Sequence, residues 1–393
     1  MSGKPILLQN ARYFANGKFQ KADIRISGST IAEICDQIQP SKNDFVVSVE
    51  DNFVFPGLIN SHDHLEFNLF SRLGDPPYQN YVEWSTDIHR SSREEILKIT
   101  SIPLKYRLLW GAYKNLFSGV TTVVHHNRYS WRFRWRYPVE VFKDYDWIHS
   151  LQLEKRDLKK LLTSTKALRF IHLAEGIDEG SSKEFTALRK LGGLTKNTVI
   201  IHGVGLTDQD IEVMGQVAAG FVWCPSSNLF LFGRTANIEK ILGRMPVVLG
   251  TDSTLTGSFT MFDELRTAHR LVSLEMNEIV GLVTSAPADL LHMNKGRIQE
   301  NASADLLVVN ATHSDPFNVL LNLTPKGITC LMKNGVPIFG DSQFAEGLRK
   351  HGRTYSTISV GDREKFVIGD FHGLVRNIRR YSPGLLLPQA YFS

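Results

Sequence analysis

The middle of the chain alternates short apolar runs with longer stretches of helical periodicity. Runs rich in β-branched and aromatic residues, each separated from the next by a helical stretch, are typical of βα units and a parallel sheet. The predicted strands are residues 119–124, 168–171, 198–201, 220–223 and 246–249. The predicted helices are residues 92–117, 153–167, 181–191, 207–218 and 236–243. Together with residues 54–60, at least six units within about 250 residues favour a closed (β/α)8 TIM barrel, an α/β fold.

Residues 129–153 interrupt this rhythm. Two further βα units must fit between residues 129 and 153, yet the helical periodicity there is poor. We therefore expect a barrel that is abbreviated in this region.

Both ends of the chain have the sequence pattern of short strands joined by turns. Asn16-Gly17 and Ser27-Gly28 supply turn chemistry near the N-terminus, and Lys333-Asn334-Gly335 does so near the C-terminus. We predict three parts: a small β-sandwich domain built from residues 1–53 and 300–343, a metal-dependent hydrolase barrel from residues 54–299, and a C-terminal extension of helical and irregular structure from residues 344–393.

Composition excludes several classes of protein. The content of 42% hydrophobic and 22% charged residues is ordinary for a globular protein, and the net charge of +5 is spread along the chain except at Arg128–Arg136, so nucleic-acid binding is not indicated. We expect no signal peptide, because only a few apolar residues follow Met1–Pro5, and no membrane span, because no uninterrupted apolar run is long enough. Cys35, Cys224 and Cys330 are too widely spaced for a disulfide framework. We expect a cytoplasmic protein without a membrane partner.

Polar residues stand where the predicted strands end. His62 and His64 follow the run at residues 54–60, and strand alternation places both imidazoles on one face and Asp63 on the other. Three later strands end at His172, His202 and Asp252. Because the C-terminal ends of parallel strands meet at one face, we expect these side chains to converge. Neutral imidazoles with one carboxylate suit a divalent transition metal, and an open position would hold a water of lowered pKa.

Two further residues admit more than one interpretation. Glu175 lies just past His172, where a carboxyl group could shuttle a proton between water and substrate, or could be an acid at a helix N-terminus. His202 could be a fifth ligand, or a base that orients the water.

The motifs resemble the amidohydrolase superfamily, and within it the aminohydrolase branch that includes guanine deaminase, cytosine deaminase, methylthioadenosine/S-adenosylhomocysteine deaminases and triazine hydrolases. The resemblance covers about residues 1–340. It rests on Pro56-Gly57-Leu58-Ile59-Asn60 before His62 and His64, on His172-x-x-Glu175, His202-Gly203, Cys224-Pro225-Ser226-Ser227-Asn228 and Gly250-Thr251-Asp252-Ser253, and on Ala304-Asp305-Leu306.

The resemblance implies roles for these residues. The metal ligands would be His62, His64, His172 and Asp252, holding one divalent ion, zinc before iron or manganese. The catalytic residues would be Glu175, as proton donor to a ring nitrogen or leaving group, His202, which would hold the water or tetrahedral intermediate, and Asp252, which would also accept the proton of the water. No lysine at a barrel-strand end matches the carbamate of two-metal members, so a single metal is favoured.

The resemblance implies a hydrolase that acts on carbon–nitrogen bonds of a small-molecule substrate. We expect deamination of a purine- or pyrimidine-like amine by attack of metal-bound hydroxide. The alternatives are a cyclic-amide hydrolase of the imidazolonepropionase type and a catalytically silent scaffold protein. We also expect a homodimer. The roles of His125, His126 and the loop Trp131–Arg136, which could bind substrate or form a subunit contact, stay open, and no substrate-binding residue is assigned.

Overall fold

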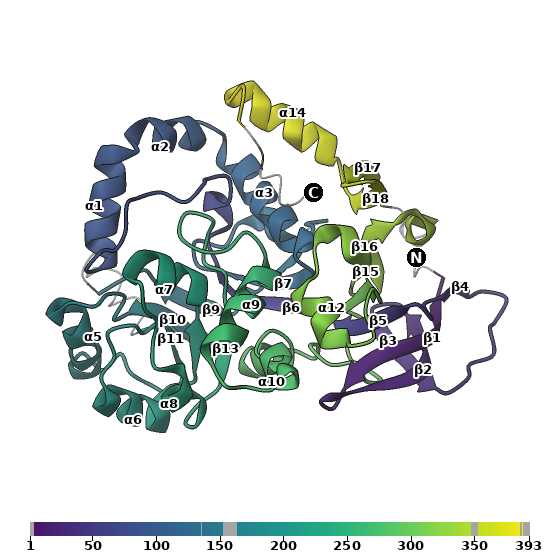
Figure 1. Cartoon of the computed structure of the whole chain (residues 1–393), viewed down its shortest axis with the longest axis horizontal. Helices are drawn as coiled ribbons and strands as arrows, with labels where there is room; N and C mark the ends of the chain where they lie inside the picture. The colour runs from purple at the N-terminus through teal and green to yellow at the C-terminus, as the bar shows by residue number, and fades with distance from the viewer. Residues whose placement is uncertain (1–3, 135, 152–162, 347–352, 386, 388–393) are drawn as a thin grey trace.

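A computed structural model describes residues 4–134, 136–151, 163–346, 353–385 and 387. Figure 1 shows the helices and parallel strands gathered on one side of the molecule and a β-rich part on the other. Residues 152–162, which hold most of the helix predicted at 153–167, lie outside the described residues. None of the described helices is long and apolar enough to cross a membrane.

Parallel strands build the part that holds the predicted site. One sheet contains β6 (Leu58–Asp63), β7 (Val120–His125) and β8 (Glu140–Val141), and the other contains β9 (Tyr145–Ile148), β10 (Leu168–Leu173), β11 (Thr198–His202), β12 (Gly220–Trp223) and β13 (Val247–Leu249). Every neighbouring pair in both sheets is parallel. Nearly all their side chains are buried, as expected for parallel strands that are covered on both faces.

The two parallel sheets meet at both edges and enclose a barrel. At one junction the backbone N–H of Asp252, just after β13, donates to the carbonyl oxygen of His62 on β6 at 3.0 Å. Gly250 permits this approach, because a Cβ there would lie 2.6 Å from the Cβ of His62. At the other junction the His126 Nε2, just after β7, lies 3.1 Å from the carbonyl oxygen of Ile148 on β9. The predicted TIM-barrel architecture is confirmed.

The barrel is abbreviated around β8. Only residues 142–144 separate β8 from β9, and the two strands run in the same direction, β8 along β7 and β9 along β10. They are therefore successive parts of one passage between β7 and β10. The connection from β7 to β8 contains a short 3-10 helix, η2 (Trp131–Arg134), and no described α-helix. Among the described residues, the connection before β8 therefore supplies none of the helical cover that βα units normally provide.

Helices cover the other strands, as Figure 1 shows for α5, α6 and α8. The described helices are α1 (Tyr81–Ser91), α2 (Arg93–Thr100), α3 (Leu104–Phe117), α5 (Glu179–Lys190), α6 (Asp208–Val217), α7 (Pro225–Phe232), α8 (Ile238–Leu242), α9 (Met261–Leu271), α10 (Met276–Gly281), α11 (Ser285–Leu290), α12 (Pro316–Leu321) and α14 (Phe371–Tyr381). The single helix predicted for residues 92–117 is two helices, because Pro103 lacks an N–H and has an extended backbone (ψ 135°) before α3. Reciprocal capping boxes of Thr207 with Asp210 and of Thr260 with Asp263 fix the starts of α6 and α9.

One ten-stranded sheet joins the two ends of the chain, in the order β17-β18-β16-β15-β14-β5-β1-β2-β3 with β4 beside β1. Its strands are β1 (Ile6–Ala15), β2 (Lys18–Ser27), β3 (Thr30–Cys35), β4 (Phe45–Ser48), β5 (Asn52–Pro56), β14 (Leu306–Asn310), β15 (Ile328–Lys333), β16 (Val336–Asp341), β17 (Tyr355–Val360) and β18 (Arg363–Ile368). Antiparallel pairing of β5 with β14 makes the connection. The strands β17 and β18 were not predicted from the sequence, where residues 344–393 are expected to be helical and irregular.

Candidate metal centre

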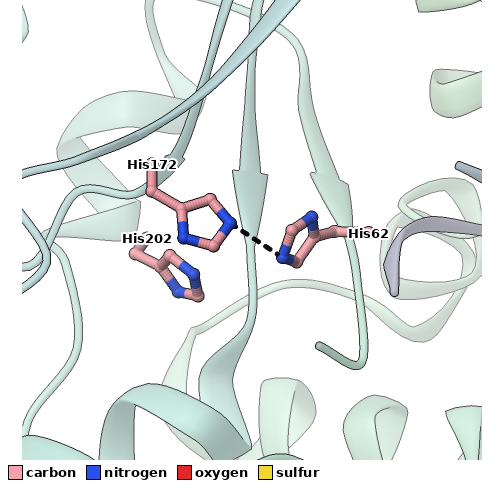
Figure 2. Close-up of side chains that lie close together, drawn as sticks. All are labelled: His62, His172 and His202. Carbon is pink, nitrogen blue, oxygen red and sulfur yellow. Dashed lines mark hydrogen bonds between the residues drawn. The ribbon is translucent and has the colours of Figure 1, made fainter. Parts of the chain in front are cut away.

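Residues from four barrel strands converge at one point of the barrel. The Nε2 atoms of His62 on β6 and His172 on β10 lie 3.2 Å apart, and Figure 2 shows these two imidazoles with His202 from β11 beside them. The carboxylate of Asp252, just after β13, places Oδ1 3.8 Å from the Nε2 of His62 and 3.6 Å from the Nε2 of His64. All five side chains are buried. The structure thus brings together every residue that the sequence singled out as a metal ligand.

The donor atoms fit a bound divalent cation. Two groups of ligand atoms lie within 4.8 Å of one another, His62 with His172 and His202, and His62 with His64 and Asp252. Two nitrogens on a tetrahedral zinc ion are about 3.3 Å apart, close to the observed His62–His172 separation. Burial lowers the pKa of His62 and His172 well below 6.5 and that of His64 to about 4. The imidazoles are therefore neutral, the form that binds a metal.

Among the described residues, three buried nitrogens of this cluster lack a hydrogen-bond partner, which also favours a bound ion. Within the described part of the chain, the Nε2 of His202 and the Nδ1 atoms of His62 and His64 have no hydrogen-bond partner, although each is buried. Buried polar atoms without a partner are costly and rare in native proteins. An ion bound in this cluster would give a nitrogen such as the Nε2 of His202 a partner.

Glu175 lies between two of the histidines. Its Oε2 is 3.2 Å from the Nδ1 of His172 and its Oε1 is 3.5 Å from the Nε2 of His202, and only 5% of the residue is exposed. Burial raises the pKa of Glu175 well above 4.5, and the nearby carboxylates of Asp252 and Glu184 add to this. A buried carboxyl group of raised pKa is suited to donate a proton to a substrate.

Hydrogen bonds from the start of α7 orient His202 and Asp252. The Nδ1 of His202 lies 3.0 Å from the Oδ1 of Asn228, whose amide nitrogen donates to Thr235, so we assign the imidazole proton to Nδ1. The Nε2 of His202 is then left as the basic nitrogen facing Glu175. The hydroxyl groups of Ser227 and Thr256 each donate to the Oδ2 of Asp252 at 2.8 Å. These contacts fix which carboxylate oxygen faces the histidines.

Three residues of the site adopt a left-handed backbone conformation. The φ angles are 52° at Ala174, 70° at His202 and 55° at Asp252. This region is uncommon for residues other than glycine, and such strain clusters at functional sites. The backbone N–H of Ala174 is held by the carboxylate of Glu184 at 2.7 Å, which stabilises the turn that carries Glu175.

Two histidines that the sequence left unassigned belong to the same cluster. His126, just after β7, stacks on His172 with ring centroids 4.4 Å apart, and His149, just after β9, lies 5.5 Å from the ring of His64. The signal was the same as for the predicted ligands, a histidine at a strand end. For His149 it was missed because the strand before it was not recognised. His125 turns away from the cluster, toward the carboxylate of Glu66 at 3.7 Å.

The comparisons with known proteins agree with this fold. Residues 162–338 match the model of the amidohydrolase family. This region, somewhat under half of the chain, is an amidohydrolase family domain, and the protein is a metal-dependent hydrolase of the class that acts on carbon–nitrogen bonds. Its donor set accordingly takes a divalent metal.

Similar proteins are found among curated sequences and solved structures. The chain is 25% identical over 386 residues to a 5-methylthioadenosine/S-adenosylhomocysteine deaminase of Thermococcus sibiricus, covering 81% of this chain and 88% of the relative. It is 26% identical over 364 residues to a 5'-deoxyadenosine deaminase of Methanocaldococcus jannaschii, covering 78% and 85%. Among structures, a zinc-bound adenosine deaminase from Xanthomonas campestris has a TM-score of 0.66 at 15% identity, covering 97% of this chain and 98% of the other. The triazine hydrolase from Arthobacter aurescens has a TM-score of 0.71 at 15% identity, covering 97% and 100%.

Proposed function

We propose that this hydrolase deaminates a purine-like heteroaromatic amine, with one divalent metal, zinc, held by His62, His64, His172 and Asp252. The observation that carries the proposal is the position of Glu175, whose two carboxyl oxygens face His172 and His202 while burial raises its pKa. A proton donor beside a metal cluster is what expulsion of an amine requires. The curated relatives, named for deamination of adenosine derivatives, support a purine over a pyrimidine.

The reaction consumes one water and releases ammonia. A metal at this site supplies Lewis acidity and lowers the pKa of the water that it binds. The carboxylate of Asp252 accepts the proton of the attacking water as oxygen bonds to the carbon that carries the amine. Glu175 donates its proton to the ring nitrogen, and the proton held by Asp252 then leaves with the amine as ammonia. The second proton of the water, on the new hydroxyl group, returns to Glu175 as the carbonyl group forms. His202, held by Asn228, presents its basic Nε2 to the new oxygen.

The test is a comparison of products on protein of known metal content. Elemental analysis of protein purified without added metal should find about one zinc per chain. Adenosine, 5'-deoxyadenosine, methylthioadenosine, guanine and cytosine are then assayed for ammonia release, with the cyclic amide imidazolonepropionate assayed for ring opening. Ammonia from a purine supports the proposal. Ring opening without ammonia would instead favour the cyclic-amide hydrolase, and absence of metal even after titration would favour the silent scaffold.

We further propose that the protein acts as a homodimer in the cytoplasm. Light scattering of the purified chain measures the first, and fractionation of cells measures the second. Neither result bears on the chemistry of the metal centre.

A further inference from the structure

A cavity of about 620 Å³ lies beside β8, away from the metal centre. Its walls come from four parts of the described chain: residues 129, 133, 134, 136, 137 and 139–144; residues 333, 334, 336 and 338 of β15, β16 and the turn between them; Met293; and Arg353 with Ile368. It occupies the side of the barrel where the connections before and after β8 contain no described α-helix. None of the proposed metal ligands, nor Glu175 or His202, lines it. The loop with arginine and aromatic residues that was a candidate for substrate binding contributes to this second cavity through Phe133, Arg134 and Arg136.

Positive charge dominates the walls of this cavity. The cationic side chains are Arg134, Arg136, Lys143, Lys333 and Arg353. The walls also carry two carboxylates, and each already has a cationic partner outside the lining: Glu140 binds Lys295 at 2.9 Å and Asp144 binds Lys166 at 3.4 Å. Over the described ranges, neither Arg136 nor Arg353 forms an ion pair. Asp305 and Glu140 raise the pKa of Lys333, so carboxylates offset this cation in part. Among the residues that the structure describes, the lining still carries five cations and two carboxylates.

Among these cations, Arg353 gives the strongest indication of a bound anion. Its Nη1 is buried and has no hydrogen-bond partner in the part of the chain that the structure describes. Burial lowers the pKa of Arg353, and the positive charge of Arg136 lowers it further. Burial also lowers the pKa of Lys333 to about 8, and its Nζ donates to the carbonyl oxygen of Tyr137 at 2.6 Å. Cations that repel one another are costly to hold close together unless an anion accompanies them.

Aromatic rings form another part of the lining. Tyr129 and Phe133 pack with centroids 5.3 Å apart, and Phe133 and Tyr137 with centroids 5.0 Å apart, while Phe142 lines the cavity beside them. A cavity of this volume, with a few convergent polar groups on an aromatic wall, has the dimensions of a site for a small organic ligand. Guanidinium groups beside aromatic rings suit bidentate contacts to an anionic group and stacking of a planar one.

We propose that this cavity is a second ligand site, which binds a small aromatic anion through Arg136 and Arg353. The anionic group is a phosphate or a carboxylate, both of which match the guanidinium fork. The proposal does not depend on the reaction at the metal centre, because the two sites share no residue.

Calorimetric titration of the full metal-loaded chain tests the proposal, with phenyl phosphate, benzoate, inorganic phosphate and phenol as probes. We expect phenyl phosphate or benzoate to bind with a Kd below about 1 mM, and the one that binds more tightly identifies the anionic group. Inorganic phosphate and phenol should each bind at least about tenfold more weakly, because inorganic phosphate lacks the aromatic ring and phenol lacks the anionic group.

Variants assign the binding to this cavity. The double substitution Arg136→Gln with Arg353→Gln should weaken the tighter probe at least about tenfold, the expected loss of bidentate contacts. The matched control is Arg132→Gln, on the same loop, whose guanidinium lies over the ring of Trp131 at 4.8 Å and does not line the cavity. Equal thermal unfolding midpoints establish that the variants fold, and the single variant of the exposed Arg136 replaces the double one if the latter unfolds.

Three results would overturn the proposal. The first is that no anionic probe binds. The second is equal binding by the wild type and the folded variants, which would place the anion elsewhere, for example on the metal. The third is inorganic phosphate binding as tightly as phenyl phosphate, which would refute the aromatic part of the site.

Discussion

Lys114 and Asp63 form an ion pair beneath the metal centre, with Nζ 3.0 Å from Oδ2 and both side chains fully buried. Asp63 stands between His62 and His64 on β6 and points away from them, as strand alternation predicts. Lys114, on α3, also donates to the hydroxyl of Thr251 at 2.6 Å, one residue before Asp252. A single ammonium group thereby ties the strand of the His-x-His pair to the strand end that carries the carboxylate.

Replacement of Lys114 by methionine should destabilise the fold by about 3–5 kcal/mol, because it leaves a buried carboxylate without its cation. Urea unfolding measures the change, and the accompanying displacement of Asp252 should reduce the metal content. In the double variant Lys114→Met with Asp63→Asn, the uncompensated charge is gone, so we expect at least half of the lost stability to return. A single variant that loses less than about 1 kcal/mol would show that the pair does not hold the two strands together.

The substitution Asp252→Asn should abolish turnover and weaken metal retention, since an amide oxygen is a poorer ligand than a carboxylate and cannot accept the proton of water. Elemental analysis after dialysis against a chelator measures retention, and an ammonia assay measures turnover. The Oδ2 contacts of Ser227 and Thr256 lie beside the same carboxylate, so Ser227→Ala is a milder companion change. Full activity of the asparagine variant would contradict the assigned roles.

The substitution Glu175→Gln should retain the metal and reduce kcat by about 10²–10⁴-fold, as expected when a proton donor is removed. Glu179→Gln is a matched control, because Glu179 is an exposed glutamate at the start of α5 that contacts Lys183 at 2.6 Å. If the Glu175 variant loses its metal as well, the residue supports the ligands instead of donating a proton.

Asn228 should matter for the rate without touching the proposed metal ligands. Its Oδ1 accepts the Nδ1 proton of His202, so Asn228→Ala removes the group that fixes the imidazole tautomer. We expect kcat to fall about 10–100-fold, the usual effect of losing such a supporting contact, with metal content unchanged. Asn228→Asp, which keeps an acceptor oxygen, should restore part of the rate. Equal losses in both variants would indicate a packing effect.

Glu264 should make the stability of the protein depend on pH. Burial raises its pKa from 4.5 to about 7, while its carboxyl oxygens accept the backbone N–H groups of Ser226 and Ser258, each at 3.2 Å. Between pH 4.5 and about pH 7, the carboxyl group of Glu264 therefore keeps its proton in the folded chain and loses it in the unfolded chain. Its contribution is thus complete below pH 4.5 and is lost as the pH rises through about 7.

The variant Glu264→Gln cannot lose this proton. Between pH 5 and pH 8 we expect the wild type to lose about 2–3 kcal/mol more of its free energy of unfolding than the variant does. Urea unfolding at both pH values gives the two slopes. Parallel pH profiles would show that Glu264 is ionised in the folded protein throughout this range.

The sequence predicts those parts of the site whose signal is local. His62, His172 and Asp252 each follow a recognisable apolar run, so the barrel topology alone brings them together. His149 follows the short strand β9, which has no helix before it, and the pattern of strand and helix alternation therefore passes over it. The pairing of Lys114 with Asp63 was equally invisible, because a buried lysine on a helix looks like any solvated one until its neighbours are known.

The C-terminal strands show a signal that was present but not used. In β17, Ser356, Ile358 and Val360 are buried while Thr357 and Ser359 between them are exposed, the alternation of a strand with one solvated face. Mixed charge in β18 obscured the same reading. Whether such segments form strands is decided by pairing with strands that are distant in the sequence, and not by composition.

The pairing of β5 with β14 has a consequence for how the chain reaches this structure during synthesis. On the ribosome, the edge of β5 emerges long before its partner, because the whole barrel from residue 57 to residue 305 is made in between. Phe53, Val54 and Phe55, all buried in the finished sheet, must wait without β14 during that interval, although Phe53 and Val54 can already pair with β1 on their other edge. The barrel is therefore the part that can fold first, and the N-terminal strands complete their sheet last. Chains that stop before residue 306 should expose this apolar edge and aggregate, even with every residue of the metal centre present.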